Sequence, residues 1–360
     1  MSGYEGTALS IRGLYKVFAD DHGDGLRLAE GGASKEAVQE QTGAVVGLRD
    51  INIEIATGEL FVVMGLSGCG KSTLVRCINR LIEPSVGQVW LNGREITAMN
   101  EDELREVRRH DLAMVFQHFG LMPHRSVLDN VALPLEVGGV AKTERRERAG
   151  EALELVGLAD WLDSMPNQLS GGMKQRVGLA RGLAMETPVL LMDEPFSALD
   201  PVIRRDLQDE LLALQESVQK TIVFITHDLN EAVRVGDRIA IMRDGAVVQL
   251  GAPNEVVLNP ADSFVREFTQ DVRLHGMVTA ASIMDSSAEA LAVETEDRYV
   301  VLEDAVLDEL VPAGLSATQP LQVVNRAGAL VGVIPLERLA RAMVSDEAAV
   351  AATSEGEEVA

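Results

Sequence analysis

The stretch FVVMGLSGCGKST, residues 61–73, decides the fold of this chain. An apolar run typical of a buried strand leads directly into the pattern G-x-x-x-x-G-K-S, and a helical run, STLVRCINRL, follows from Ser72. In such a strand–turn–helix context, backbone N–H groups turn inward around an anion and the helix N-terminus adds a favourable field. The stretch therefore predicts a loop that binds the phosphates of a nucleotide. The alternative is a chance glycine loop, and the flanking strand and helix argue against it.

This phosphate loop (residues 65–73) supplies both charge and a metal ligand. We expect the Lys71 ammonium to reach the β- and γ-phosphates and the Ser72 hydroxyl to coordinate Mg²⁺. The residues expected to contact the nucleotide are Gly65, Leu66, Ser67, Gly68, Cys69, Gly70, Lys71, Ser72 and Thr73.

Two adjacent carboxylates end another apolar run, PVLLMDEP, residues 188–195. Asp193 is expected to hold Mg²⁺ through its water shell. Glu194 follows at the edge of the site, where a carboxylate can accept a proton from an attacking water. Alternatively, Glu194 only caps the next turn. The neighbouring Asp193 and the phosphate loop favour the catalytic interpretation.

Two more polar residues end predicted strands, Gln117 in LAMVFQ and His227 in TIVFITH. A single Gln or His at such a position is often structural. Ligands of open α/β sheets bind beyond the carboxyl ends of the strands. Two such residues in one sheet therefore favour contacts with the attacking water and the γ-phosphate.

Short apolar runs alternate with helical patterns over residues 61–270, which predicts an α/β core with a mostly parallel sheet. Two further segments, 8–18 and 45–55, read as antiparallel strands and are separated by a polar insert (residues 19–43). The strands expected in the parallel sheet are LFVVMG, LAMVFQ, PVLLMDEP, TIVFITH and RIAIMRDG. Their Val, Ile and Leu content suits strands that are buried on both faces.

Composition limits the possible partners and surroundings. The formal net charge of −24 argues against a nucleic-acid partner, because Lys and Arg bind phosphate backbones. The N-terminal sequence lacks the pattern of a signal peptide, and the apolar runs are much shorter than a membrane span. The two cysteines, Cys69 and Cys77, suit a reducing compartment. We therefore expect a soluble, acidic, intracellular protein.

The ordered set GLSGCGKST, Gln117, LSGGMKQR (169–176), LLMDEP, SALD (197–200) and His227 resembles an ABC-transporter ATPase. The resemblance covers about residues 8–270. It implies a P-loop NTPase fold of the ABC-ATPase type, with a parallel core, an antiparallel β subdomain and a helical subdomain at 118–187 that contacts a permease. ATP and Mg²⁺ are the implied cofactors, with Gln117, Ser72 and Asp193 around the metal.

The same resemblance assigns a role to LSGGMKQR, which we call the signature segment. Ser170, Gly171 and Gly172 are implied to bind the γ-phosphate of ATP held by a second copy in a head-to-tail dimer, with SALD along the interface. Phe18 is implied to stack on the adenine; the alternative is a core aromatic. One chain would thus supply half of each of two ATP sites.

The segment GASKEAVQEQTG (32–43) and the sequences around the phosphate loop resemble, more narrowly, the ATPase subunit of glycine betaine/proline importers. The resemblance implies ATP hydrolysis that powers uptake of an osmoprotectant such as glycine betaine, proline or choline. It also implies a separate membrane permease, an extracytoplasmic substrate-binding protein and a peripheral position on the cytoplasmic face of the inner membrane. The insert could instead be an incidental surface helix.

The C-terminal region differs from the rest in composition. Residues 271–360 hold 16 acidic side chains, five arginines and no lysine. Residues 319–343 resemble half of a CBS module, which gives predicted domains of 1–270 for the ATPase, 271–345 for a CBS-like regulatory region and 346–360 for an acidic disordered tail. Whether the single motif pairs with its twin in a dimer stays open. Whether the acidic charge responds to salt or only aids solubility also stays open.

Two other functions remain as alternatives. A non-transport ABC ATPase of translation or DNA maintenance is disfavoured by the single ATPase segment and the acidic charge. An importer ATPase for another small solute, such as an amino acid, would share all the motifs. Aromatic residues make up only 4% of the chain and form no cluster, so the residues themselves do not reveal the solute.

Overall fold

The structure is a computed structural model that describes residues 6–20, 23–116, 120–197, 199–270, 279–287, 299–305, 307–317, 319–340 and 342. Residue contacts divide the chain into two compact units, Met1–Leu250 and Gly251–Ala360. This division, after Leu250, falls before residue 270, which is the end predicted from the sequence for the ATPase region.

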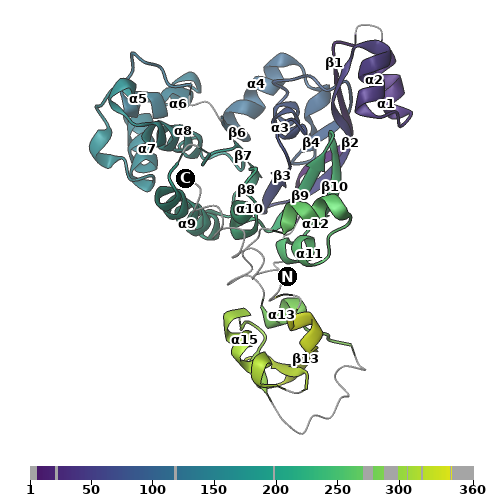
Figure 1. Cartoon of the computed structure of the whole chain (residues 1–360). Helices are drawn as coiled ribbons and strands as arrows, with labels where there is room; N and C mark the ends of the chain where they lie inside the picture. Colours follow the sequence, from purple (N-terminus) through teal and green to yellow (C-terminus); the bar gives the residue numbers. More distant parts are fainter. Residues whose placement is uncertain are drawn as a thin grey trace, which may run out of the picture. The chain divides into compact units, whose positions relative to one another are not determined.

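A six-stranded sheet forms the centre of the first unit, in the order β10-β9-β3-β8-β7-β6 (Figure 1). The pairs β3–β8, β3–β9, β7–β8 and β6–β7 are parallel, which confirms the predicted parallel core. All five predicted strands lie in this sheet. Its strands are β3 (Leu60–Met64), β6 (Leu112–Val115), β7 (Val189–Asp193), β8 (Thr221–Ile225), β9 (Arg238–Arg243) and β10 (Ala246–Gly251).

An antiparallel sheet, in the order β2-β1-β4-β5, covers part of this core. Its inward-facing residues on β2 alternate on either side of an irregularity at Asp50 (φ 43°), because successive side chains of a strand point to opposite faces. Val46, Leu48, Ile51 and Ile53 are all buried. The strands are β1 (Thr7–Phe18), β2 (Val45–Ala56), β4 (Val86–Leu91) and β5 (Arg94–Glu95).

The polar insert folds as two short helices, α1 (Asp24–Glu30) and α2 (Lys35–Thr42), which pack on β1 and β2. Figure 1 shows both helices beside these two strands. Helix α2 begins at the N-cap Ser34, whose side chain accepts a hydrogen bond from Ala37 N, and ends before Gly43 at φ 75°.

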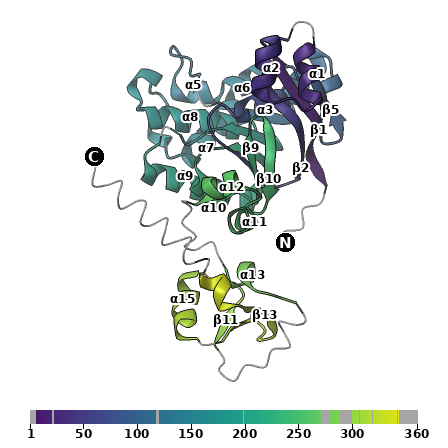
Figure 2. The same ribbon diagram turned by 45° about the vertical axis from the view of Figure 1, so that its right-hand side comes forward.

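Helices complete the first unit. Helix α3 packs on β2, β7 and β8, while α5, α7 and α8 pack on one another and α8 also contacts β6. Figure 2 shows α5, α7 and α8 at the left of the first unit and α1 and α2 at its upper right. The helices are α3 (Lys71–Ile78), η1 (Ile96–Ala98), α4 (Glu101–His110), α5 (Val127–Val131), α6 (Leu133–Val137), α7 (Lys142–Leu155), η2 (Ala159–Trp161), η3 (Pro166–Gln168), α8 (Gly171–Leu183), α9 (Pro201–Val218) and α10 (Leu229–Val235).

The main core lies between the two sheets and around α3. Alternate residues of the parallel strands enter it, among them Phe61 and Val63 of β3 and Leu191 of β7, and they meet Leu74 of α3 and Leu48 of β2. Both faces of β3, β7 and β8 are buried, as predicted. This packing holds the carboxyl ends of these strands, where the site lies, on a rigid support.

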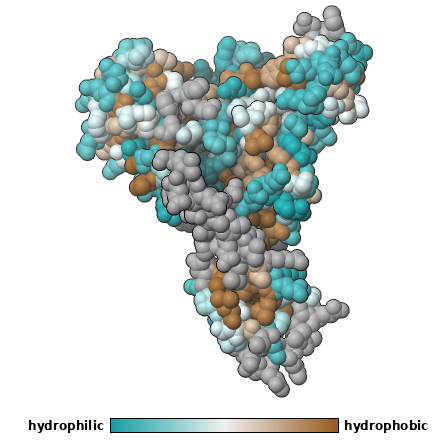
Figure 3. Space-filling view, in the orientation of Figure 1, coloured by the Kyte–Doolittle hydropathy of each residue, from teal (hydrophilic) through white to brown (hydrophobic). Residues whose placement is uncertain are grey.

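The second unit contains a three-stranded sheet in the order β11-β12-β13. The strand–turn–strand–helix order predicted for 319–343 is present, with helical residues at 336–340; the predicted tail, 346–360, lies outside the described residues. Apolar side chains also reach the surface of this unit, as the brown areas of Figure 3 show. Its elements are α11 (Pro253–Leu258), α12 (Ser263–Thr269), α13 (Ala280–Ile283), β11 (Val300–Leu302), α15 (Leu307–Ser316), β12 (Leu321–Val324) and β13 (Leu330–Ile334).

None of the helices in the described ranges is long and apolar enough to cross a membrane.

Candidate active site

The phosphate loop connects β3 to α3 at the carboxyl edge of the parallel sheet. Gly65, Gly68 and Gly70 have φ of 146°, 78° and 109°, a region that favours glycine. The Lys71 ammonium donates hydrogen bonds to the carbonyls of Gly65 at 2.6 Å and Leu66 at 3.1 Å. The glycines thus fold the loop around the lysine, as the motif predicts.

The backbone of β2 touches this loop directly. A Cβ atom on Gly70 would lie 2.5 Å from the carbonyl oxygen of Gly47, and one on Gly245 would lie 3.0 Å from the same atom. The first distance is too short for any side chain. At this point the backbone of the antiparallel sheet approaches the phosphate loop so closely that Gly70 has no room for a side chain.

A pocket of about 310 Å³ lies between the loop and β2. Its lining unites residues from the two sheets, the phosphate loop and the polar insert, and it includes the predicted adenine-stacking Phe18 and the predicted base Glu194. The Phe18 side chain is 36% exposed, so its ring is accessible to a base. The lining residues are Phe18, Lys35, Val45, Val46, Gly47, Ser67, Gly68, Gly70, Lys71, Ser72, Thr73 and Glu194.

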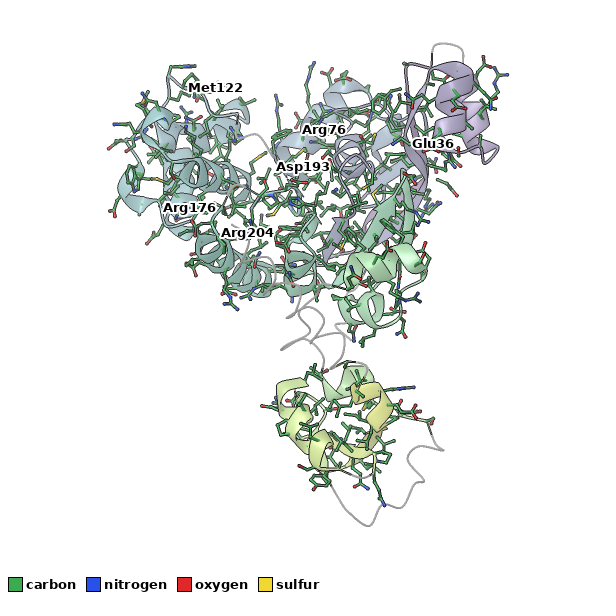
Figure 4. All side chains as sticks on the ribbon, viewed as in Figure 1. Glu36, Arg76, Met122, Arg176, Asp193 and Arg204 are labelled. Carbon is green, nitrogen blue, oxygen red and sulfur yellow. The ribbon has the colours of Figure 1, made fainter. Side chains whose placement is uncertain are left out.

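Asp193 ends the buried strand β7 and lies beneath the phosphate loop. Its Oδ1 accepts a hydrogen bond of 2.9 Å from Ser72 Oγ. Its Oδ2 is buried and has no hydrogen-bond partner among the described residues, although Arg76 Nη2 lies 3.9 Å away. Figure 4 shows Arg76 and Asp193 as neighbours in the middle of the first unit. Burial raises the pKa of the Asp193 carboxyl, and the Ser72 hydroxyl and Arg76 act in the opposite direction.

This pair of groups fits Mg²⁺. The ion prefers oxygen ligands, keeps several waters and binds through few protein groups together with phosphates. A hydroxyl beside a buried carboxylate with one unbonded oxygen meets these needs. In the part of the chain that the structure describes, no group of three or more His, Cys, Asp or Glu could hold a metal ion.

Glu194 and His227 come together at the ends of β7 and β8. Glu194 has φ 49°, a left-handed backbone that is uncommon for a residue with a side chain. His227 Nδ1 lies 3.3 Å from Glu194 Oε1. The Gln175 amide of helix α8 donates a 3.3 Å hydrogen bond to the backbone carbonyl of Glu194. The predicted base thus stands between the histidine and helix α8, which begins within the signature segment. The third predicted residue, Gln117, lies outside the described residues.

A tight turn sets the position of His227. Thr226 Oγ1 donates to the buried Glu231 carboxylate at 2.6 Å, and Asp228 caps α10 by accepting from Asn230 N and Glu231 N. These bonds fix both neighbours of His227, while its own side chain remains 60% exposed. The imidazole can therefore contact a ligand without rearrangement of the turn.

The first residues of the signature segment lie outside the pocket. Ser170 caps α8 and accepts a hydrogen bond from Met173 N, and Gly171 begins the helix. Ser170 and Gly171 are exposed, and neither they nor Gly172 belongs to the lining of the described pocket. A Cβ on Gly172 would lie 3.1 Å from Leu199, in the segment SALD, whose Ala198 lies outside the described residues. The start of α8 and the phosphate loop are therefore separate elements of the chain.

Several site residues escaped the sequence-based prediction. Arg76 lies four residues after Ser72 on one helix, and that spacing alone places both on one face. Lys35 and Gly47 carry no comparable signal, because their approach to the loop depends on how distant segments pack. Gln175 is part of the signature segment, but nothing local indicates its bond to Glu194.

Known proteins share these features. The family model described as ABC transporter matches residues 48–197. The glycine betaine/proline betaine transport system ATP-binding protein of Salmonella typhimurium is 52% identical over 287 residues, which are 80% of this chain and 72% of that protein. A trimethylamine N-oxide transport system ATP-binding protein of Ruegeria pomeroyi is 51% identical over 264 residues, 73% of this chain and 77% of that protein.

A solved dimeric ABC ATP-binding cassette, in a post-hydrolysis state with ADP and phosphate, aligns with a TM-score of 0.59 at 33% identity. The alignment covers 68% of this chain and 98% of the cassette. With its phosphate loop, adjacent carboxylates, histidine and signature segment in place, the chain belongs to the ABC transporter family, as an ATP-binding protein of the glycine betaine/proline betaine type.

Proposed function

We propose that this chain is the ATP-hydrolysing subunit that powers import of an osmoprotectant through a separate membrane permease. ATP is the nucleotide of its family. The observation that carries the proposal is the convergence of Lys71, Ser72, Asp193, Glu194 and His227 on one sheet edge beside a nucleotide-sized pocket. The relatives named above, which transport methylated amines, support the solute class.

The site residues divide the chemistry of phosphoryl transfer. Lys71 and the loop backbone bind the phosphates, and Ser72 and Asp193 hold Mg²⁺, which neutralises charge on the phosphate oxygens when bound. Glu194 accepts the proton of the attacking water, and His227, 3.3 Å from it, contacts the γ-phosphate side of the site. Gln117 is proposed to complete the contacts to water and metal.

The active form is proposed to be a head-to-tail dimer. The exposed signature segment at the start of the long helix α8 is a favourable place for an anion, but it does not line this chain's own pocket. In a dimer, Ser170, Gly171 and Gly172 of one copy would meet the ATP bound by the other. The dimeric state of the solved cassette supports this arrangement.

A groove of about 590 Å³ between the edge strand β6 and the helical group is the proposed permease contact. Leu81 and Phe116 line it and are 47% and 41% exposed, while Arg76, Arg108 and Arg181 supply positive charge. No Asp or Glu occurs among its described lining residues. These properties fit a short permease segment that combines apolar and acidic side chains, which would place this chain on the cytoplasmic face of the inner membrane.

The test is reconstitution of this chain with its permease and substrate-binding protein in lipid vesicles. Uptake of labelled glycine betaine that requires internal ATP supports the proposal, with trimethylamine N-oxide, choline, proline and an unrelated amino acid as comparison solutes. Leu81→Asp should abolish co-purification of the permease, whereas Val137→Asp, an exposed position outside the groove, should not. Uptake of the unrelated amino acid alone would contradict the assigned solute class, and ATP-independent uptake would contradict the function.

A further inference from the structure

We propose that Lys35, in the polar insert, binds the phosphates of the nucleotide, so that the insert forms part of the ATP site. The proposal rests on the proposed function, because it concerns the same pocket. It gives the insert a task that neither the motifs nor the composition reveals.

The insert is anchored firmly enough to position a side chain. Val38 of α2 is fully buried and Ala29 of α1 is 1% exposed, and both pack with Val17 of β1 and Val46 of β2. Asp20 accepts hydrogen bonds from the backbone of α1, and the Arg49 guanidinium of β2 donates to the carbonyl of Ala33. Asp20 therefore holds α1, and Arg49 ties the chain just before α2 to the antiparallel sheet.

Lys35 is the first residue of α2 and is half-buried at the pocket. It lines the same cavity as Phe18 at one end and Lys71 at the other. Lys35 and Lys71 are the two cations of the described lining, and Glu194 is its one carboxylate. Lys35 makes no hydrogen bond or ion pair with any described residue, so its ammonium is available for a ligand.

The charge of Lys35 also acts on the phosphate loop. Burial raises the pKa of the Cys69 thiol in the loop, and Lys71 and, more weakly, Lys35 act in the opposite direction. A nucleoside triphosphate bound in this pocket carries several negative charges on its phosphate groups. A second cation in the same pocket as Lys71 would therefore lower the free energy of the bound phosphates relative to the free nucleotide.

Other cations of the insert lack this position. Arg27 of α1 forms an exposed ion pair with Asp24 and does not line the pocket. Arg27→Gln and Lys35→Gln each remove one positive charge from the insert, so the pair separates a local contact from a change in net charge. Lys35→Arg keeps the charge.

The experiment measures the Kd of ATP, ADP and adenosine for the full-length chain by competition with a fluorescent ATP analogue. Because the ammonium is partly solvated, we expect Lys35→Gln to raise the Kd of ATP and ADP about three- to tenfold. The Kd of adenosine should not change, Arg27→Gln should match the unaltered chain, and Lys35→Arg should retain most of the affinity. The effect should shrink as salt rises, since exposed charges are screened.

Equal affinities for Lys35→Gln and Arg27→Gln would overturn the inference. An equal loss for adenosine and ATP would also overturn it, because the contact would then be to base or sugar. The variant Lys71→Ala distinguishes a failure of this inference from a failure of the proposed function. If Lys71→Ala weakens ATP binding while Lys35→Gln does not, the ATP site stands and only Lys35 is wrong; if neither variant matters, the site itself is wrong.

Discussion

A single methyl group on Gly47 should weaken ATP binding without unfolding the protein. An alanine Cβ there would lie 2.7 Å from Cε2 and 3.3 Å from Cδ2 of Phe18. Because the Phe18 ring is the exposed end of a side chain, we expect the ring to shift while strand β2 keeps its position. Restoring an ordinary 3.4 Å contact from 2.7 Å requires a shift of about 0.7 Å.

The size of the effect follows from this shift. Stacking of a base on an aromatic side chain contributes about 1–3 kcal/mol. A gap of 0.5–1 Å forfeits about a quarter to a half of a van der Waals contact. Gly47→Ala should therefore cost about 0.3–1.5 kcal/mol, or about a two- to tenfold increase in the Kd of ATP, whereas Phe18→Ala should lose the whole stack, about five- to a hundredfold.

The assay is competition with a fluorescent ATP analogue, accompanied by thermal unfolding to verify the fold. Gly150→Ala in helix α7 is the matched control, since no atom lies within 4 Å of its added Cβ, and its affinity should not change. The double variant Phe18→Ala/Gly47→Ala should bind no more weakly than Phe18→Ala, because the ring is already absent. Additive losses in the double variant, or an unaltered Kd in Gly47→Ala when Phe18→Ala is impaired, would refute the reasoning.

Three further outcomes are expected. Glu194→Gln should keep ATP binding, lose about 10²–10⁴-fold in turnover and accumulate as an ATP-bound dimer in size-exclusion chromatography; wild-type turnover would show that the base lies elsewhere. Lys71→Ala and Ser170→Arg should each be inactive alone, yet mixed together they should regain hydrolysis, because a mixed dimer then holds one unaltered composite site; a mixture that stays inactive although the two chains form mixed dimers would argue for independent chains. Burial raises the pKa of the Cys77 thiol to about 12 and also raises the pKa of the Cys69 thiol. Neither thiol should therefore react with maleimide near pH 8 until urea unfolds the chain, and mass spectrometry would detect the labelling. Rapid labelling of Cys77 in the folded chain would contradict its burial.

The predictable part of the site is the part that is local in sequence. The phosphate loop and the pair Asp193–Glu194 depend on spacing within one strand and its following turn, so the chain itself displays them. The parallel sheet was predictable because its strands are buried on both faces and therefore read as continuous apolar runs.

The rest of the site depends on packing between segments far apart in the chain. Lys35 reaches the pocket only because Val38 and Ala29 seat the insert on β1 and β2. A surface helix in the insert was only an alternative in the sequence-based prediction, although Ser34 and Gly43 at the ends of α2 are ordinary cap residues. No neighbouring residue indicated which way the side chain of Lys35, the first residue of α2, would face. A polar segment with few apolar residues also gives only a weak helical periodicity of hydrophobic residues.

The contact of Gly47 with Gly70 and Gly245 limits which substitutions the sequence of this protein can accept. The carbonyl of Gly47 occupies the space that a Cβ at either of the other two positions would need. A clash between side chains can be relieved by making one of them smaller, but here one partner is a backbone atom that no substitution shortens. Gly70 and Gly245 therefore offer no compensating second mutation. Laboratory evolution towards other nucleotides should leave these two glycines unaltered and draw its variation from Phe18, Lys35 and Val45 instead.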